Sequence, residues 1–511
     1  MNSFKKNLVL IYTTKFFGIL SGFLSLLLVV PKLTSNPAIY GVYTICVSLG
    51  IFFSYADLGF LSACQKYAAE YYVQKNLQGE MRVVAFVLFI LAVFIGVITL
   101  LLFVIANSPE LIIKAATKND LLISSKLIFI LAIFSPSIII QKLNVLVYSI
   151  RIEDYIYQSI EIIFNLFKIL SIGFFVSKTS YDIVGYFLTT QILSLCSGLI
   201  CVYIIVKKYD YQIIPLLKYF RFSKEMYNKT KSLAFSSLLM TIAWILYFEF
   251  DTIILSKFYG IKVVATYAVA VVFLNFSRTL YNVIFGPYLA YFYRFTGVND
   301  KEGLYVAFTN LLKWTFPLMV IPPLVLITYM DSIIRVWVGN AFSDSILISR
   351  FFVFIIAMTS FCIPISYFMI VNSFNRIMRI MALILPVLFY SCLLLYDYYG
   401  LGEKSLALAT MTTIFCNLIG YVYFLGTLLG TKIIDFYVSL LKKIILPLIS
   451  LYVIYWLLPP LFINIKGDLI SYLKLGTYVV FTMIIPLFVY YVREKSIRTI
   501  FLKVLNFRKT N

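Results

Sequence analysis

Residues Phe250 to Arg278 read FDTIILSKFYGIKVVATYAVAVVFLNFSR. This stretch begins near the end of one long apolar segment, turns at Tyr259-Gly260 and continues into a second apolar segment. Asp251 and Arg278 therefore lie in sequence that is otherwise apolar enough for lipid. A charge inside a bilayer costs from about 3 to more than 10 kcal/mol, so it needs a partner, a water-filled cavity or a function. We interpret the stretch as the start of the second half of a membrane-embedded chain, because it follows the longest basic loop.

The composition is that of a protein embedded in a membrane. Of the 511 residues, 62% are hydrophobic and only 13% are charged, whereas a soluble protein has about 25% charged residues. Apolar segments of about 20 residues, the length that crosses a bilayer as a helix, recur along the whole chain. These segments are continuous and do not alternate with polar residues as barrel strands do. The sequence therefore predicts an all-α polytopic membrane protein with about 14 transmembrane helices.

Membrane topology explains the net charge of +21 better than a nucleic-acid partner does. Lys and Arg gather in the short polar loops, and they are far more frequent on one side of the predicted helices than on the other. This bias places both the N-terminus and the C-terminus in the cytoplasm. We expect no nucleic-acid partner, because the sequence leaves no soluble basic domain to bind one.

The sequence lacks the usual residues of catalytic and metal sites. It contains no His, which is the commonest metal ligand and general base. Its seven Cys are scattered, mostly inside apolar segments, and none forms a Cys-x-x-Cys pair. We therefore expect no enzyme activity, no catalytic residue, no metal and no cofactor.

The order of the apolar segments predicts four parts. Residues 1–206 form an N-terminal six-helix lobe, and residues 207–231 form a basic amphipathic linker on the cytoplasmic membrane surface, with its apolar side chains facing lipid. Residues 232–429 form a second six-helix lobe, and residues 430–511 form a final pair of helices and a basic cytoplasmic tail. The two lobes would be related by a pseudo-two-fold axis along the membrane normal, with substrate between them.

Four basic residues inside the predicted helices are candidates for a substrate-binding cavity: Lys15, Lys168, Arg278 and Lys313. Arg278 lies deep in its helix, and its planar group of donors suits phosphate or carboxylate. A structural partner such as Asp57 or Asp251 is the alternative for Arg278. If the four basic side chains share one central cavity, that cavity favours a polyanion or a pyrophosphate-linked headgroup over an organic cation.

Three acidic residues inside the predicted helices are candidates for binding a coupling ion: Asp57, Glu249 and Asp251. Lys15 and Asp57 lie at about the same depth, since each is about seven residues from the inner end of its helix. They form either a structural ion pair, or a cavity wall and a cation site. Glu249 and Asp251 point to different faces of their helix, so only one of them faces a cavity directly. Asp251 could instead cap the helix or pair with a nearby lysine.

Three segments resemble one family of transporters. IYGVYTICVSLGIFFSYADLGF, from Ile39 to Phe60, resembles the second helix of the bacterial polysaccharide flippases of the O-antigen or Wzx type. FDTIILSKFYGIKVVATYAVA resembles the start of the second half of these flippases, and IIRVWVGNAFSDS resembles the outer loop before their tenth helix. The resemblance covers essentially the whole chain in length and layout, and its motifs mark the wider multidrug/oligosaccharidyl-lipid/polysaccharide exporter superfamily.

The resemblance implies a two-lobed bundle that works by alternating access in the bacterial inner membrane. Such a protein moves an undecaprenyl-pyrophosphate-linked oligosaccharide, the repeat unit of a polysaccharide or O-antigen, from the inner to the outer leaflet. The resemblance also implies a cationic cavity, to which Arg278 and Lys15 would belong, and coupling to Na⁺ or H⁺. Asp57 and Asp251 match acidic positions of the family pattern. Membrane lipids and a polysaccharide polymerase are the other candidate partners.

Two other function classes fit the sequence less well. A multidrug extruder of the same fold, or another exporter of lipid-linked precursors, stays open as an alternative. A multidrug pocket would carry acidic and aromatic residues to accept organic cations, whereas the predicted helices here have an excess of basic residues. A membrane glycosyltransferase or polymerase would need a large extramembrane loop or a fixed acid–base or metal constellation, and the sequence offers neither.

Overall fold

The structure is a computed structural model of the chain, and it describes residues 2–114, 117–177, 180–297, 300–372, 375–429, 432–457 and 469–493. Within these ranges the regular elements are helices, and an isolated bridge joins Val176 to Tyr181. The predicted all-α polytopic fold is confirmed. The predicted basic tail after residue 493 lies outside the described residues.

The chain divides into two compact units, Met1–Ala268 and Val269–Asn511. The first unit contains α1 (Asn2–Leu28), α2 (Val30–Leu33), α3 (Pro37–Ser54), α4 (Phe60–Val73), α5 (Leu77–Asn107), α6 (Lys118–Phe134), α7 (Ser137–Ile150), α8 (Asp154–Phe175), α9 (Ile183–Tyr209), α10 (Ile213–Tyr219), α11 (Lys224–Phe248), α12 (Asp251–Phe258) and the start of α13 (Ile261–Gly297). The second unit contains the rest of α13, α14 (Lys301–Trp337), α15 (Ser345–Val371), α16 (Asn375–Tyr398), α17 (Lys404–Leu429), α18 (Lys432–Leu457) and α19 (Leu469–Arg493). Short 3₁₀ turns lie at Pro109–Leu111 and Asn340–Phe342.

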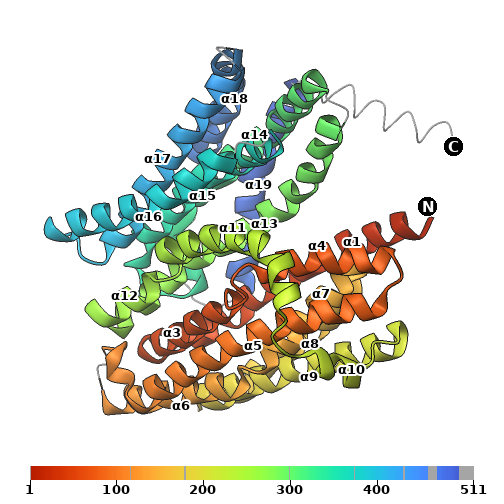
Figure 1. Cartoon of the computed structure of the whole chain (residues 1–511). Helices are drawn as coiled ribbons and strands as arrows, with labels where there is room; N and C mark the ends of the chain where they lie inside the picture. Colours follow the sequence, from red (N-terminus) through yellow and green to blue (C-terminus); the bar gives the residue numbers. More distant parts are fainter. Residues whose placement is uncertain are drawn as a thin grey trace. The chain divides into compact units, whose positions relative to one another are not determined.

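Within each unit the long helices pack side by side. In the first unit α8 lies between α1 and α9, and α5 lies between α4 and α6 (Figure 1). The broken pair α11 and α12 belongs to this unit, where α11 packs on α4 and α12 packs on α3. In the second unit α15 contacts both α14 and α17, and α19 contacts both α14 and α18.

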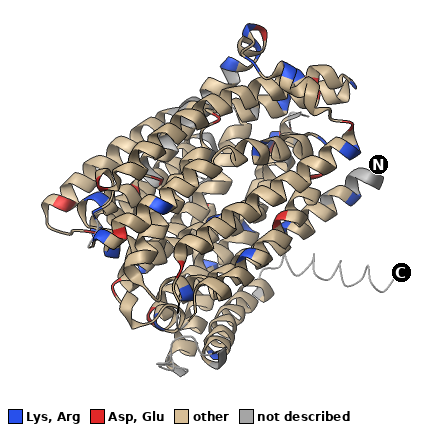
Figure 2. Cartoon of the chain, turned by 90° about the horizontal axis from the view of Figure 1, so that it is seen from below, with Lys and Arg blue, Asp and Glu red and all other residues tan. Residues whose placement is uncertain are grey.

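Ten helices of the described residues are long and apolar enough to cross a membrane, or eleven if α6 and α7, which are bent by 47° at their junction, form one span. The other predicted spans correspond to helices that are short or broken: α3 with α4, α11 with α12, and α16. The predicted number of fourteen spans therefore stays a prediction. Charged residues are sparse along most of the ribbon (Figure 2), and large apolar side chains such as Leu170 and Phe174 are exposed, as lipid-facing surfaces require.

Two of the predicted helices are interrupted. The sequence predicts one helix from Tyr40 to about Cys64, but α3 ends at Ser54 and α4 begins at Phe60. Leu58 and Gly59 between them have φ of 46° and 79°, a left-handed conformation that a right-handed helix cannot contain. The other interrupted helix is the one predicted for residues 232–255, which breaks at Glu249 and Phe250. Hydropathy did not reveal either break, because the interrupted sequence stays largely apolar.

Hydroxyl groups satisfy the carbonyls that two prolines leave without their usual amide donor. A proline has no N–H, so the carbonyl four residues before it loses its helical partner. On α14, Pro317 frees the Lys313 carbonyl, which accepts a bond from the Tyr490 hydroxyl at 3.2 Å. The second pair is the Leu318 carbonyl before Pro322, bonded to the Tyr281 hydroxyl at 3.3 Å. In lipid this solvation by side chains is what makes an intrahelical proline tolerable.

Candidate functional site

Several charged residues among the membrane helices of the first unit lie near a residue of opposite charge. Asp57 lies in the break between α3 and α4, where its Oδ2 accepts a hydrogen bond from the Leu61 amide at 3.2 Å. The Asp57 charge also attracts the ammonium group of Lys142 on α7. Asp57 thus satisfies an amide at the start of α4 and balances the charge of a lysine within a membrane helix.

Lys15 lies on an exposed face of α1 and interacts with the carboxylate of Asp154 in the first turn of α8. Next to it, the Thr14 hydroxyl donates to the Gln158 side chain on α8 at 2.9 Å. Lys15 and Asp57 each interact with a residue of opposite charge on another helix. This arrangement favours two separate pairs over the predicted Lys15–Asp57 pair.

Lys168 forms the third pair, with Glu161 two turns earlier on α8. Glu161 also accepts a hydrogen bond from the Ser197 hydroxyl on α9 at 2.6 Å. Lys168 is half-buried, and it follows Asp154 by about 20 Å along the helix axis at 1.5 Å per residue. Lys15 and Lys168 therefore lie at different depths of the first unit, although α1 and α8 are neighbours.

The two helix breaks of the first unit meet. Tyr55, at the break after α3, donates a hydrogen bond from its hydroxyl to the Glu249 carboxylate at the break between α11 and α12, at 2.9 Å. The rings of Phe52 and Phe250 pack edge to face with their centroids 5.4 Å apart. Because these contacts join residues almost 200 positions apart (|i−j| = 194), they hold α11 and α12 on the first unit.

Asp251 is buried at the start of α12 and accepts a hydrogen bond from the Tyr267 hydroxyl on α13. Of the nearby lysines, Lys257 donates to the Glu110 carbonyl at 3.0 Å. Glu249 and Asp251 thus contact different elements, and they lie on either side of a helix break rather than on two faces of one helix. A tyrosine hydroxyl donates to each of these two carboxylates.

The remaining two predicted cations lie in the second unit. Arg278 is half-buried on α13, and its Nη1 lies 3.5 Å from the Asn275 side-chain oxygen one turn earlier. Lys313 is half-buried on α14, with its Nζ 5.8 Å from the centroid of the Phe436 ring on α18. Lys15 and Lys168 belong to the first unit, so a cavity shared by all four side chains stays a prediction.

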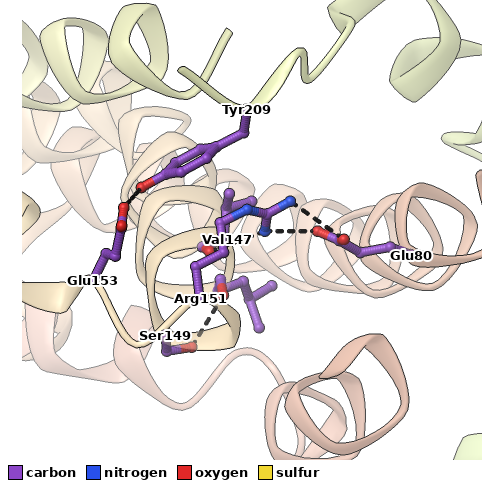
Figure 3. Close-up of polar contacts among 7 residues, drawn as sticks. Glu80, Val147, Ser149, Arg151, Glu153 and Tyr209 are labelled. Carbon is purple, nitrogen blue, oxygen red and sulfur yellow. Dashed lines mark hydrogen bonds and ion pairs between the residues drawn. The ribbon is translucent and has the colours of Figure 1, made fainter. Parts of the chain in front are cut away.

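A buried cluster that the sequence did not predict joins the starts and ends of several helices in the first unit (Figure 3). Arg151, just after α7, binds both carboxylate oxygens of Glu80 on α5 at 2.8 and 3.3 Å. The side chains of Arg151 and Glu80 are only 5% and 1% exposed. Such a bidentate pair is strongly directional, and it fixes the end of α7 against α5.

Three tyrosine rings surround the Arg151 guanidinium. Their centroids lie 5.0 Å (Tyr72), 4.7 Å (Tyr209) and 5.6 Å (Tyr211) from its central carbon, within the range of a cation–π attraction. The cluster therefore also includes α4, the end of α9 and the residues that lead into α10.

Glu153 extends the cluster by accepting hydrogen bonds from Lys208 and from the Tyr209 hydroxyl. Burial raises the pKa of the Glu153 carboxyl, but the hydrogen bonds from Lys208 and Tyr209 outweigh burial and hold this pKa below its ordinary value. Glu153 is therefore ionised at neutral pH. The charged RIED sequence, Arg151 to Asp154, could have indicated a polar cluster at this turn. It could not have indicated Glu80, the partner of Arg151, which lies 71 positions away in the chain.

We expect the Asp57–Lys142 pair to be detectable as a coupling free energy. Asp57→Asn and Lys142→Met should each lower the free energy of unfolding by about 1 kcal/mol, the upper end for an ion pair that is not fully buried, since both residues are only half-buried. The double variant should lose less than the sum of the two single losses. Thermal or denaturant unfolding in detergent measures this. Additive losses would show that the two charges do not interact.

The described ranges contain no group of three or more Cys, Asp or Glu side chains that could hold a metal ion. The arrangement offers instead intramembrane acid–base pairs, carboxylates hydrogen-bonded to tyrosines, and half-buried cations on the second unit.

The sequence matches no protein-family model and no curated protein, but the fold matches solved structures. The lipid II flippase MurJ in an inward closed conformation aligns with a TM-score of 0.66 at 15% identity, over 95% of this chain and 98% of MurJ. An inward-facing MATE multidrug resistance transporter of the MOP superfamily aligns with a TM-score of 0.58 at 14% identity, over 82% of this chain and 96% of the transporter. A MOP superfamily transporter from Pyrococcus furiosus, described as having a binding pocket of reverse polarity, aligns with a TM-score of 0.57 at 14% identity, over 82% of this chain and 95% of that transporter.

These structural alignments show the fold. The alignments extend over nearly the full length of each matched structure, and the described helices are long and apolar enough to cross a bilayer many times. The chain is therefore a multi-pass membrane protein whose fold is shared by the lipid II flippase MurJ and by MATE transporters.

Proposed function

We propose that this protein is a flippase for a lipid-linked oligosaccharide, in which an undecaprenyl-pyrophosphate-type carrier bears the repeat unit of a polysaccharide or O-antigen. It moves this substrate from the inner to the outer leaflet of the bacterial inner membrane by alternating access, with N- and C-termini in the cytoplasm. Transport is coupled to Na⁺ or H⁺.

The observation that carries the proposal is the extent of the match to a lipid-linked flippase. The alignment to MurJ includes 95% of this chain, whereas the alignment to the MATE transporter includes 82%. This chain therefore has residues that align with MurJ and not with the MATE transporter. A transporter of a long lipid-linked substrate would use such residues for additional lipid-facing helices. The final helices α18 and α19, which pack on α14, fit that use.

Four cations among the membrane helices supply the charge that such a substrate needs. A pyrophosphate carries several negative charges, and a guanidinium binds phosphate oxygens with two parallel hydrogen bonds. We assign headgroup binding to Arg278 and Lys313 of the second unit, and to Lys15 and Lys168 of the first. Asp57, Glu249 and Asp251 are the candidates for the coupling ion, since each is a carboxylate at a helix break where a change of protonation or cation binding alters local contacts.

Export of organic cations is the second candidate function. The acidic residues of the first unit favour it, because a carboxylate in a membrane-embedded site attracts cationic molecules. Asp57, Asp154 and Glu161 each interact with a lysine, which lowers the negative charge available to a drug. We therefore rank this function below the flippase.

The test is to follow the lipid-linked oligosaccharide in a strain that lacks the gene. With a labelled sugar, the intermediate should accumulate in the inner leaflet and should clear when the wild-type gene is restored. Arg278→Ala should slow clearance about tenfold or more, because a hydrogen bond to a charged group contributes about 1.5–3 kcal/mol. Arg278→Lys should retain part of the activity, since it keeps the charge and loses the fork of donors.

Lys262→Ala is the matched control, because Lys262 is a basic residue on an exposed surface of the same helix α13. It should clear the intermediate at the wild-type rate, with all variants expressed at equal levels. If the deletion strain accumulates no intermediate and instead becomes sensitive to cationic drugs, the flippase proposal is wrong and the second candidate replaces it.

A further inference from the structure

The short helix α10 presents an apolar face that the rest of the chain leaves open. Ile213, Ile214 and Leu217 are 45%, 81% and 63% exposed, whereas Leu216 on the other side of the helix is 7% exposed. Successive residues of a helix are 100° apart, so Ile213, Leu217 and Ile214 cover one continuous face. An exposed apolar face of this kind marks a contact with lipid or with another protein.

Contacts with α5 fix the orientation of this face. The Tyr219 ring lies under the Arg82 guanidinium at 5.2 Å. The Phe220 ring packs against Phe89 with centroids 5.6 Å apart, and the next aromatic residue, Phe222, packs in the same way against Phe86 at 6.1 Å. Together with buried Leu216, these contacts hold α10 against α5. The predicted linker is thus attached to the first unit along its length, and only part of its apolar surface is free for lipid.

The depth of α10 follows from the length of α5. A helix crosses the hydrocarbon core with about 20 residues, and α5 has 31. Its first two turns carry Glu80 and Arg82, so the additional residues project from the membrane at this end. Phe86 and Phe89 then lie where α5 enters the hydrocarbon, and α10, which packs beside them, lies at the boundary between headgroups and acyl chains.

Basic side chains border the open face. Lys218 follows Leu217 directly, and Arg221 and Lys224 follow in the connection to α11 and at its start; all three are exposed. Two exposed acidic residues, Asp210 and Glu225, flank this segment, so its exposed charges are mainly basic. An apolar face bordered by Lys and Arg matches the chemistry of an interface that contains anionic lipid, where each basic residue adds to the attraction.

We infer that α10 is a membrane-interface anchor that recognises anionic phospholipid. Ile213, Ile214 and Leu217 enter the upper acyl-chain region, and Lys218, Arg221 and Lys224 bind lipid phosphates of the same leaflet. This inference does not depend on the transported substrate. An anchored α10 would hold this end of the first unit at a defined depth in the membrane.

The test uses the full chain in vesicles, with its seven cysteines replaced by Ser or Ala and a single cysteine introduced for a fluorescent label. Ile214→Cys places the label on the open face, and Glu225→Cys places it at the start of α11 as the control. Vesicles contain phosphatidylcholine alone or phosphatidylcholine with phosphatidylglycerol, each with or without acyl-chain bromination. Bromine quenching at Ile214 should be several-fold greater than at Glu225, and phosphatidylglycerol should increase it.

A further variant separates the two parts of the inference. Lys218→Gln with Arg221→Gln and Lys224→Gln should abolish the effect of phosphatidylglycerol and should keep the quenching in phosphatidylcholine. Equal, weak quenching at both positions would show that α10 lies in water and would overturn the anchor. A label at Ile214 that is shielded from aqueous iodide but unquenched by bromine would put a protein partner or a second copy on the face. Quenching without any effect of phosphatidylglycerol would overturn the recognition of anionic lipid.

Discussion

Arg151→Ala is expected to destabilise the first unit by about 3–5 kcal/mol, which is the cost of removing one partner of a buried ion pair. The Glu80 side chain is 1% exposed, and its two carboxylate oxygens each accept a hydrogen bond from Arg151. Without the guanidinium its carboxylate must either remain charged in an apolar environment or take up a proton. The three tyrosine rings around Arg151 would also lose their central contact. Denaturant titration of the detergent-solubilised protein measures the loss.

Two further variants distinguish a buried pair from an ordinary surface pair. Arg335→Ala breaks the Arg335–Asp331 pair, whose side chains are 38% and 34% exposed, and should cost less than about 1 kcal/mol. Glu80→Leu combined with Arg151→Met removes both charges and should recover much of the loss. If Arg151→Ala costs no more than Arg335→Ala, the cluster does not stabilise the unit.

Tyr490→Phe is expected to cost about 1–3 kcal/mol, because it leaves the Lys313 carbonyl without a donor in a helix surrounded by lipid and apolar side chains. Pro317 is the reason for this dependence, since it removes the amide that would otherwise bond to that carbonyl. In a Pro317→Ala background the Ala amide can supply the missing bond. The same Tyr490→Phe substitution should then cost close to nothing, and unfolding of the four proteins of this cycle in detergent tests the expectation.

The adjacent residue provides the control. The Tyr491 hydroxyl donates to the Trp314 carbonyl at 2.9 Å, but residue 318 is a leucine, whose amide can also donate to that carbonyl. Tyr491→Phe should therefore cost less than Tyr490→Phe, although both residues lie on α19 and both bond to α14. Equal costs for the two substitutions, or an equal cost of Tyr490→Phe with and without Pro317, would contradict the role given to the proline.

These hydroxyl–proline pairs explain how α14 remains helical through two of its three prolines, Pro317 and Pro322. They also show what α19 contributes to the second unit. α19 supplies Tyr490, and Tyr472 on the same helix donates to the Trp337 carbonyl at the end of α14 at 3.1 Å. α19 is thus a source of hydrogen-bond donors for α14.

The sequence by itself determined the class of protein and most of its helices. Hydropathy is a local property, and a run of about 20 apolar residues has few stable options other than a membrane helix. For example, the apolar run of residues 346–371 predicts a membrane helix, and the structure has α15 there, Ser345–Val371. The sequence also identified which charges lie within the membrane helices, because a charged residue in an apolar run is visible without any knowledge of its neighbours.

Only the tertiary structure decided which of these charges interact and where the helices break. The partners of Asp57, Glu80 and Lys313 lie far from them along the chain, so no spacing rule connects them. The breaks at 55–59 and 249–250 depend on backbone angles and on the Tyr55–Glu249 bond, which the apolar character of the residues does not reveal. The physical reason is that burial in lipid depends on composition, whereas each hydrogen bond depends on which side chain packing brings within about 3 Å of it.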